Sequence, residues 1–225
     1  MTYYYKILFL SFIIPFIFSF HYKINFHKNF KIILISIPLS SIFYIIWDII
    51  FTEMGIWGFN KDYVSAYIIN LPVEEYLFFF IIPFCCLYTY HVINKYKAYL
   101  IKKINWTKFQ FLLISILSVI LVFNLSKIYT LVCFLSCILM ILISNKLKIN
   151  YSKSSFHNTF ILITIPFLLV NGALTGSFYN QTVVWYNNDM ILGLRVFTIP
   201  IEDFVYSYQL QLLNLLIYSK IKKYK

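Results

Sequence analysis

The stretch from Asn70 to Phe80 reads Asn-Leu-Pro-Val-Glu-Glu-Tyr-Leu-Phe-Phe-Phe and sets two adjacent carboxylates at the head of a long apolar run. The same frame returns near the end of the chain, from Thr198 to Tyr206, as Thr-Ile-Pro-Ile-Glu-Asp-Phe-Val-Tyr. An acid in an apolar helix is costly and is a functional candidate by default. Two acid pairs in one repeated frame therefore guide the interpretation of the whole chain.

The composition is that of a membrane protein. Of the 225 residues, 61% are hydrophobic and 12% are charged, whereas soluble domains are about 25% charged. The formal charge of +11 does not indicate nucleic-acid binding, because such modules gather basic residues on one soluble face. Here the basic residues lie in short clusters between apolar runs, so membrane lipid is the expected environment and nucleic acid is not an expected partner.

Seven apolar runs are candidates for membrane spans, each of which needs about 20 apolar residues. The first run is expected to be a retained span and not a signal peptide, because its basic residues follow it. The sequence thus predicts an all-α, polytopic protein with seven transmembrane helices. The runs are centred near Phe12, Ser41, Pro83, Leu117, Leu135, Pro166 and Leu210.

The basic residues predict the orientation, since short cytoplasmic loops carry excess lysine and arginine. Most of the basic residues follow the first, third, fifth and seventh runs. The amino terminus is therefore expected outside and the carboxyl terminus in the cytoplasm, in a multi-pass protein of the cell membrane. All the acids lie near the opposite ends of the runs. The basic residues that set the orientation are Lys23, Lys28, Lys31, Lys95, Lys97, Lys102, Lys103, Lys108, Lys146, Lys148, Lys153, Lys220, Lys222, Lys223 and Lys225.

The repeat extends upstream of the acid pairs. Trp57 precedes Pro72 at the same spacing at which Trp185 precedes Pro200. Further upstream, Asp48-x-x-x-Thr52 parallels Asn171-x-x-x-Thr175. We expect a first repeat over residues 1–96, a linker span over 97–126 and a second repeat over 127–225. Three spans per repeat with one span between them make the two repeats parallel, an arrangement that places a site between the halves.

The acid pairs are expected in the first turns of two helices, because proline is favoured at the first helical position. There an acid can simply complement the helix dipole, for about 0.3–1 kcal/mol. Adjacent helical residues diverge by about 100°, so each pair can direct one acid inward. Glu202, Tyr206 and Gln209 form a polar stripe, which predicts that Glu202 is the inward acid of the second pair. The choice between Glu74 and Glu75 stays open.

Aromatic side chains follow the first acid pair and suit a cationic intermediate. The rings of Tyr76, Phe78 and Phe79 would exclude water and offer their faces to a cation, for about 0.5–2 kcal/mol each. For any single ring, ordinary lipid-facing or core packing is the favoured explanation. Arg195, the only arginine, is either a counter-ion for Glu202 or Asp203 or an interfacial anchor.

No cofactor or metal motif accompanies the acids. The chain has no Gly-x-Gly-x-x-Gly or His-Glu-x-x-His sequence, and its few glycines form no phosphate-binding loop. Burial favours the neutral form of a carboxyl group, which can then donate a proton. An acid, a base and apolar walls suggest proton-driven rearrangement of an apolar substrate.

Two Pro-hydrophobic-Glu-Glu/Asp frames, each with a tryptophan at the same upstream position, resemble the flavin-independent lycopene cyclases of bacteria, archaea and fungi. In that family the two halves are separate membrane subunits or one fused chain, and this sequence resembles the fused form over almost its whole length. The resemblance implies protonation of the terminal double bond of lycopene, ring closure and proton removal, without a cofactor, to give the β-type rings of γ-carotene and β-carotene.

The resemblance also implies the site residues. The matched catalytic acids are Glu74, Glu75, Glu202 and Asp203, and the match does not fix which is donor and which is base. The substrate would come from the bilayer. The residues expected at the substrate are Trp57, Tyr76, Phe78, Phe79, Trp185, Arg195, Tyr206 and Gln209.

A small proton-coupled transporter or channel is the alternative function, since parallel repeats and membrane carboxylates occur there too. Such proteins usually carry broken helices in both halves. Pro83 and Pro166 do not occupy corresponding positions in the two repeats, which weakens this alternative.

Overall fold

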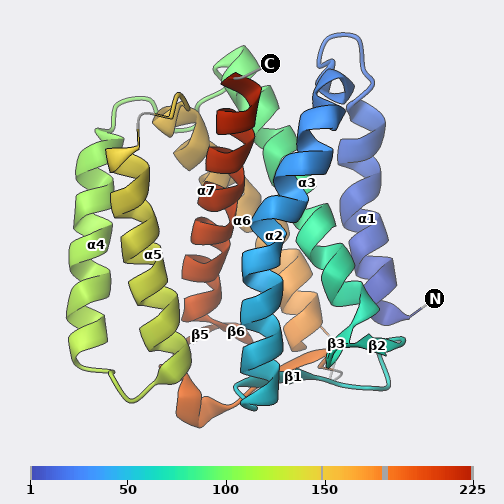
Figure 1. Ribbon diagram of the computed structural model, residues 1–225, viewed down its shortest axis with the longest axis vertical. Helices are drawn as coiled ribbons and strands as arrows, with labels where there is room; N and C mark the ends of the chain where they lie inside the picture. Colours follow the sequence, from blue (N-terminus) through green and yellow to red (C-terminus); the bar gives the residue numbers. More distant parts are fainter. Residues whose placement is uncertain (1, 148, 179–181, 224–225) are drawn as a thin grey trace.

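The structure, a computed structural model, describes residues 2–147, 149–178 and 182–223, so Lys148 and Lys225 of the basic clusters lie outside it. The described residues are mostly helical, and each predicted centre falls within one of seven helices (Figure 1). The helices are α1 (Tyr3–Phe18), α2 (Phe30–Glu53), α3 (Val73–Tyr96), α4 (Trp106–Val122), α5 (Ile128–Lys146), α6 (Lys153–Thr175) and α7 (Ile201–Lys223).

Four helical segments in the described part are long and apolar enough to cross a membrane, namely Phe26–Glu53, Val73–Tyr96, Ile128–Lys146 and Lys153–Thr175. They indicate a membrane protein. Helices α1 and α4 are apolar but shorter, with 16 and 17 residues. Helix α7 has 23 residues and is richer in polar side chains.

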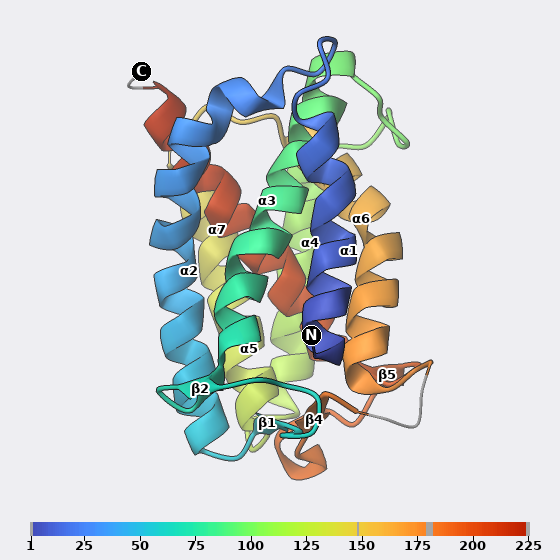
Figure 2. The same ribbon diagram turned by 90° about the vertical axis from the view of Figure 1, so that its right-hand side faces the viewer.

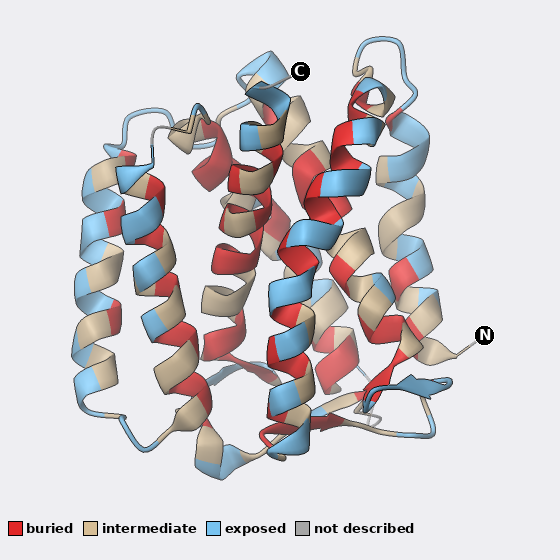
Figure 3. Ribbon diagram, viewed as in Figure 1, coloured by how far each residue is buried: buried red, intermediate tan, exposed pale blue. Residues whose placement is uncertain are grey.

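Helix α7 runs through the interior of the bundle, where it contacts α2, α3, α5 and α6 (Figures 1 and 3). This position explains its polar side chains, several of which find partners on neighbouring helices. Ser136 donates a hydrogen bond to Gln209 (2.8 Å). Asn214 accepts one from Ser40 (3.2 Å) and donates one to the carbonyl of Pro83 (3.3 Å).

Helix α3 continues through Pro83. Proline removes the hydrogen bond to the carbonyl four residues earlier, which belongs to Phe79. The hydroxyl of Ser41 in α2 donates to this carbonyl (2.6 Å). Helix α6 likewise continues through Pro166. Neither helix is broken, unlike the helices expected of the transporter alternative.

Short strands form the connections at one end of the bundle, so the expected all-α class holds for the helices and not for these loops. β2 (Tyr67–Ile68) pairs with β3 (Leu71–Pro72), and β5 (Arg195–Val196) pairs with β6 (Ile199–Pro200), each antiparallel. The positive φ of both Ile69 and Asn70 gives the first hairpin the left-handed two-residue turn that suits strand twist.

Each hairpin leads directly into a helix that begins with an acid pair. β3 ends at Pro72 and α3 begins at Val73, while β6 ends at Pro200 and α7 begins at Ile201. The prolines therefore immediately precede the helices and do not occupy the first helical position, where the sequence predicts them. The fixed φ of proline suits the extended strand as well as the helix start.

A third strand pair crosses the same end of the bundle. β1 (Trp57–Phe59) pairs with β4 (Val184–Tyr186), so that Trp57 lies opposite Tyr186. Figure 2 shows all three strand pairs at the end where α3 and α7 begin, while the carboxyl terminus lies at the other end. The loops before α2, α4 and α6, which hold most of the basic clusters, are at that other end as well.

Candidate active site

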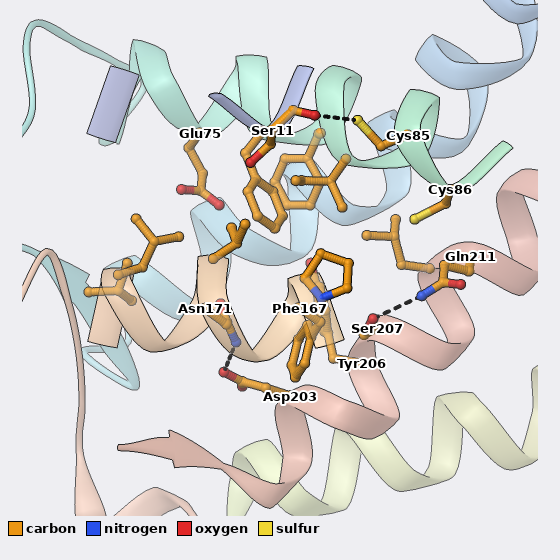
Figure 4. A pocket seen from close by; sticks show the side chains of 18 of the residues that line it. Ser11, Glu75, Cys85, Cys86, Phe167, Asn171, Asp203, Tyr206, Ser207 and Gln211 are labelled. Atoms are coloured by element: carbon orange, nitrogen blue, oxygen red, sulfur yellow. Dashed lines mark hydrogen bonds between the residues drawn. The ribbon is translucent and has the colours of Figure 1, made fainter. Parts of the chain in front are cut away.

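A cavity of about 250 Å³ lies inside the bundle, next to the first turns of α3 and α7 (Figure 4). Among the described residues, its lining comes from every helix except α4 and from strands β1 and β4. Six of the predicted site residues line it: Trp57, Glu75, Phe78, Phe79, Asp203 and Tyr206. One acid of each pair thus reaches the same space.

Glu75 enters the cavity from the first turn of α3 and is 8% exposed. The hydroxyl of Tyr4 in α1 donates a hydrogen bond of 2.6 Å to its Oε2 atom. Figure 4 shows the carboxyl group projecting into the space between α3 and α6. This answers the question that the sequence left open, since Glu75 and not Glu74 faces the cavity.

Asp203 enters the cavity from the first turn of α7 and accepts three hydrogen bonds. Tyr129 donates to Oδ1 (2.8 Å), and Tyr186 and Asn171 donate to Oδ2 (2.9 Å each). Burial and the neighbouring Asp203 carboxyl raise the pKa of Tyr186 well above its ordinary value, so its hydroxyl remains a donor. Hydrogen bonds of this kind favour the ionised form of a carboxyl group.

Asp48 is a third carboxyl group at the cavity, and the sequence did not place it there. It lies in α2, is 2% exposed and lines the same space. The indole of Trp57 donates to its Oδ1 atom (2.5 Å), while its Oδ2 atom is buried without a hydrogen-bond partner among the described residues. The repeated Asp48-x-x-x-Thr52 pattern singled out Asp48 in the sequence. The pattern alone did not predict that its side chain lies near the acids of α3 and α7.

The sequence did not identify the hydroxyl and amide groups that hold the acids, although Asn171 belongs to the repeated Asn171-x-x-x-Thr175 pattern. Tyr4, Tyr129, Tyr186 and Asn171 come from four different elements, and 17 to 74 residues separate each from the acid it contacts. No short motif connects them to the acids. Only the packing of the bundle brings them together.

The other acid of each pair lies outside the cavity and ties loops to helices. Glu74 is fully buried and accepts bonds from Thr2 (2.7 Å) and from the backbone N–H and the hydroxyl of Ser65 (2.8 and 3.0 Å). Glu202, also fully buried, accepts bonds from Thr130 (2.5 Å) and the backbone N–H of Leu192 (2.7 Å).

The prediction that Glu202 is the inward acid of α7 is therefore wrong. The polar stripe avoids the bundle surface, as expected, but Glu202 and Gln209 face α5, where they accept hydrogen bonds from Thr130 and Ser136. The Oε2 atom of Glu202 is buried without a partner among the described residues. Tyr206 alone of the stripe lines the cavity. Asp203 reaches the cavity because adjacent helical residues diverge by about 100°.

Three further predicted residues lie away from the cavity. The hydroxyl of Tyr76 donates to the carbonyl of Ile68 in the β2–β3 hairpin (2.7 Å). Trp185 is 46% exposed on β4. Arg195 donates to the carbonyl of Thr198 (2.7 Å) and to Asn188 (2.9 Å); within the described residues it forms no ion pair with either acid of α7.

The cavity combines acids with apolar and aromatic walls. Its described lining contains no lysine, arginine or histidine, and its carboxyl groups are those of Asp48, Glu75 and Asp203. The rings of Trp57, Phe78, Phe79 and Tyr206 share the walls with these acids. Such a space can hold an apolar ligand and move protons to and from it.

The family model described as lycopene cyclase matches residues 1–93 and 126–221. The chain belongs to the lycopene cyclase family. Membership places it among the carotenoid cyclases, which are enzymes of carotenoid biosynthesis, and gives no support to the transporter alternative. The two matched segments contain all three carboxyl groups of the cavity. No curated protein and no solved structure gave a significant match to the chain.

Proposed function

We propose that the protein cyclises the end groups of lycopene to β-type rings, giving γ-carotene with one ring and β-carotene with two. Glu75 and Asp203 are the acid–base pair, and the reaction is an isomerisation. The observation that carries the proposal is that these two acids, which lie in the first turns of different helices, line one cavity with aromatic walls.

The reaction balances without an oxidant or a reductant. A carboxyl O–H bond breaks and a C–H bond forms at the terminal double bond, which leaves a tertiary cation. The next double bond attacks this cation, closes the six-membered ring and moves the charge into the ring. A carboxylate then takes a ring proton as the new double bond forms. One proton enters the substrate and one leaves it.

The walls suit the cationic intermediates. Ring faces attract a cation by about 0.5–2 kcal/mol each, and four predicted aromatic residues line the cavity: Trp57, Phe78, Phe79 and Tyr206. The volume of about 250 Å³ lies just below the range usual for ligand pockets, about 300–1,000 Å³. This supports binding of one end group while the remainder of the carotenoid extends into the bilayer.

The family match and the contacts support the expected membrane layout as part of the proposal. Seven spans, an outer amino terminus and a cytoplasmic carboxyl terminus would put the acid end of the bundle near the outer surface. Residues 1–96 and 127–225 would form parallel repeats, with 97–126 as linker. A two-residue hairpin directly before each of α3 and α7, and the absence of α4 from the described cavity lining, support this division.

Expression in a lycopene-accumulating host tests the function. We expect cyclic carotenoids from the intact chain, detected by chromatography and absorption. Glu75→Gln and Asp203→Asn should each lower the product at least about 100-fold, since general acid–base groups contribute about 10²–10⁴-fold. Asp62→Asn, in an exposed loop, is the matched control and should remain active.

Membrane content of each variant is measured on the same cells by immunoblotting. Unchanged lycopene with the intact chain in the membrane would overturn the cyclase function. Full activity of both Glu75→Gln and Asp203→Asn would keep the function but remove these two acids from the chemistry.

A further inference from the structure

We propose that Asp48 is a positioning residue that shares one proton with Glu75, which makes Glu75 the proton donor and Asp203 the base. The inference rests on the proposed cyclase function and assigns the two roles within it. Asp48 acts through Glu75 and does not itself protonate the substrate.

The first observation is a difference between two matching positions. Asp48 in α2 and Asn171 in α6 each lie one helical turn before a threonine near the end of the helix. The amide of Asn171 donates a hydrogen bond to Asp203 (2.9 Å). An ionised carboxylate has no hydrogen to donate, so Asp48 cannot support a negative charge on Glu75 in this way.

The second observation is the unequal support of the two cavity acids. Asp203 accepts from three donors, Tyr129, Tyr186 and Asn171, and each of these bonds favours its ionised form. Within the described residues Glu75 accepts one bond, from Tyr4. Its electrostatic neighbours include Asp48 and Glu74, both of which are acids.

The third observation concerns Asp48 itself. Its Oδ2 atom is buried and has no hydrogen-bond partner in the part of the chain that the structure describes, although the side chain lines the cavity. The titratable groups that interact electrostatically with it include Tyr4 from α1, Glu75 from α3, Tyr186 from β4 and Tyr206 from α7. None of these is a cation, and the described lining of the cavity contains none.

Two neighbouring carboxyl groups in an apolar site without a cation disfavour each other's ionisation, so one of them keeps a proton in the resting protein. Among the described residues, Asp48 accepts from the indole of Trp57 (2.5 Å) and the hydroxyl of Thr52 (3.5 Å), whereas Glu75 accepts only from Tyr4. The extra donor favours the charge on Asp48. The shared proton therefore resides mainly on Glu75, beside the substrate. After protonation of the substrate Glu75 is ionised and Asp203 holds the ring proton, and transfer from Asp203 back to Glu75 restores the starting state.

The decisive experiment is infrared spectroscopy of the purified, substrate-free protein at neutral pH. A protonated carboxyl group has a carbonyl stretch that shifts in heavy water. The wild type should show such a band, and Glu75→Gln should lack it. Asp48→Asn should lose at least half of it, because the new amide can donate to Glu75 as Asn171 does to Asp203. Asp62→Asn, exposed and outside the cavity, should leave it unchanged.

Turnover measurements and the reciprocal variant complete the test. Asp48→Asn should lower kcat at least about tenfold, as expected for loss of a protonated general acid, while KM changes less than about twofold. Asn171→Asp should add a second protonated-carboxyl band that Asp203→Asn removes, so the inference stays testable even if Asp48→Asn fails to fold.

A Glu75 band of full size in Asp48→Asn, or no new band in Asn171→Asp, would overturn proton sharing. Because the spectra need no substrate, failure of the cyclase function appears separately, as absence of product.

Discussion

At the residue scale, the two members of each acid pair have different tasks. Glu75 and Asp203 line the cavity, whereas Glu74 and Glu202 hold neighbouring segments to α3 and α7. The helical rotation of about 100° between adjacent residues is enough to separate these tasks. An acid pair can thus serve the structure and the chemistry together.

Loss of Glu74 or Glu202 should reduce stability more than turnover. Glu74→Gln and Glu202→Gln each weaken two or three buried hydrogen bonds to a carboxylate, and we expect a loss of about 1–3 kcal/mol. Thermal unfolding in detergent measures this, and activity per folded molecule should stay within about tenfold of the wild type. Glu53→Gln, in the last turn of α2 away from the cavity lining, is the control, with a change within about 0.5 kcal/mol. Complete loss of activity in well-folded Glu202→Gln would return the chemistry to Glu202.

The sequence located the polar side chains of α7 but not their partners. The spacing of Glu202, Tyr206 and Gln209 correctly excluded a lipid-facing stripe. It could not distinguish a face toward the cavity from a face toward another helix, because both are buried and both accept polar groups. Glu202 and Gln209 face α5 because they accept hydrogen bonds from Thr130 and Ser136 there. The position of these two partners depends on helix packing.

At the element scale, a proline within a helix is compensated by a neighbouring side chain. Ser41 of α2 donates to the Phe79 carbonyl that Pro83 leaves without its helical partner. This bond joins α2 to α3 directly behind the cavity wall, since Phe79 lines the cavity.

Removal of the Ser41 hydroxyl should therefore be costly only while Pro83 is present. Ser41→Ala is expected to lower the stability by about 1–2 kcal/mol, because it leaves a buried carbonyl without a donor. In Pro83→Ala the backbone N–H at this position can bond Phe79, so Ser41→Ala should cost clearly less in that background. A double-mutant cycle of thermal unfolding in detergent measures the coupling. Equal costs in both backgrounds would show that Ser41 does not compensate for the proline.

At the scale of the whole molecule, the sequence predicted the seven helices and their order. Apolar runs and basic clusters carry that information because they act locally along the chain. The cavity has no such local signature. It requires α2 against α7 and α3 against α6, contacts between segments that are far apart in the sequence.

The division into halves predicts that the chain can be split. Co-expression of residues 1–96 and 97–225 should restore cyclisation in a lycopene-accumulating host, while neither fragment alone should give product. The reason is that Glu75 and Asp203 lie on different fragments and that α2–α7, α3–α6 and β1–β4 contacts can rejoin them. The control is a split inside α3, into residues 1–84 and 85–225, which should be inactive. Activity of one fragment by itself would contradict a shared cavity.

The pairing of β1 with β4 also bears on the fate of the reactive intermediate. Trp57, Phe59, Val184 and Tyr186 of this ribbon line the cavity at the end where the loops lie (Figure 2). In the proposed reaction, the ribbon would thus stand between the tertiary cation and the surrounding solvent. Water that reached this cation would add to it and yield an alcohol in place of a ring. The two short strands that join the halves would then also act as the barrier that makes the enzyme a cyclase and not a hydratase.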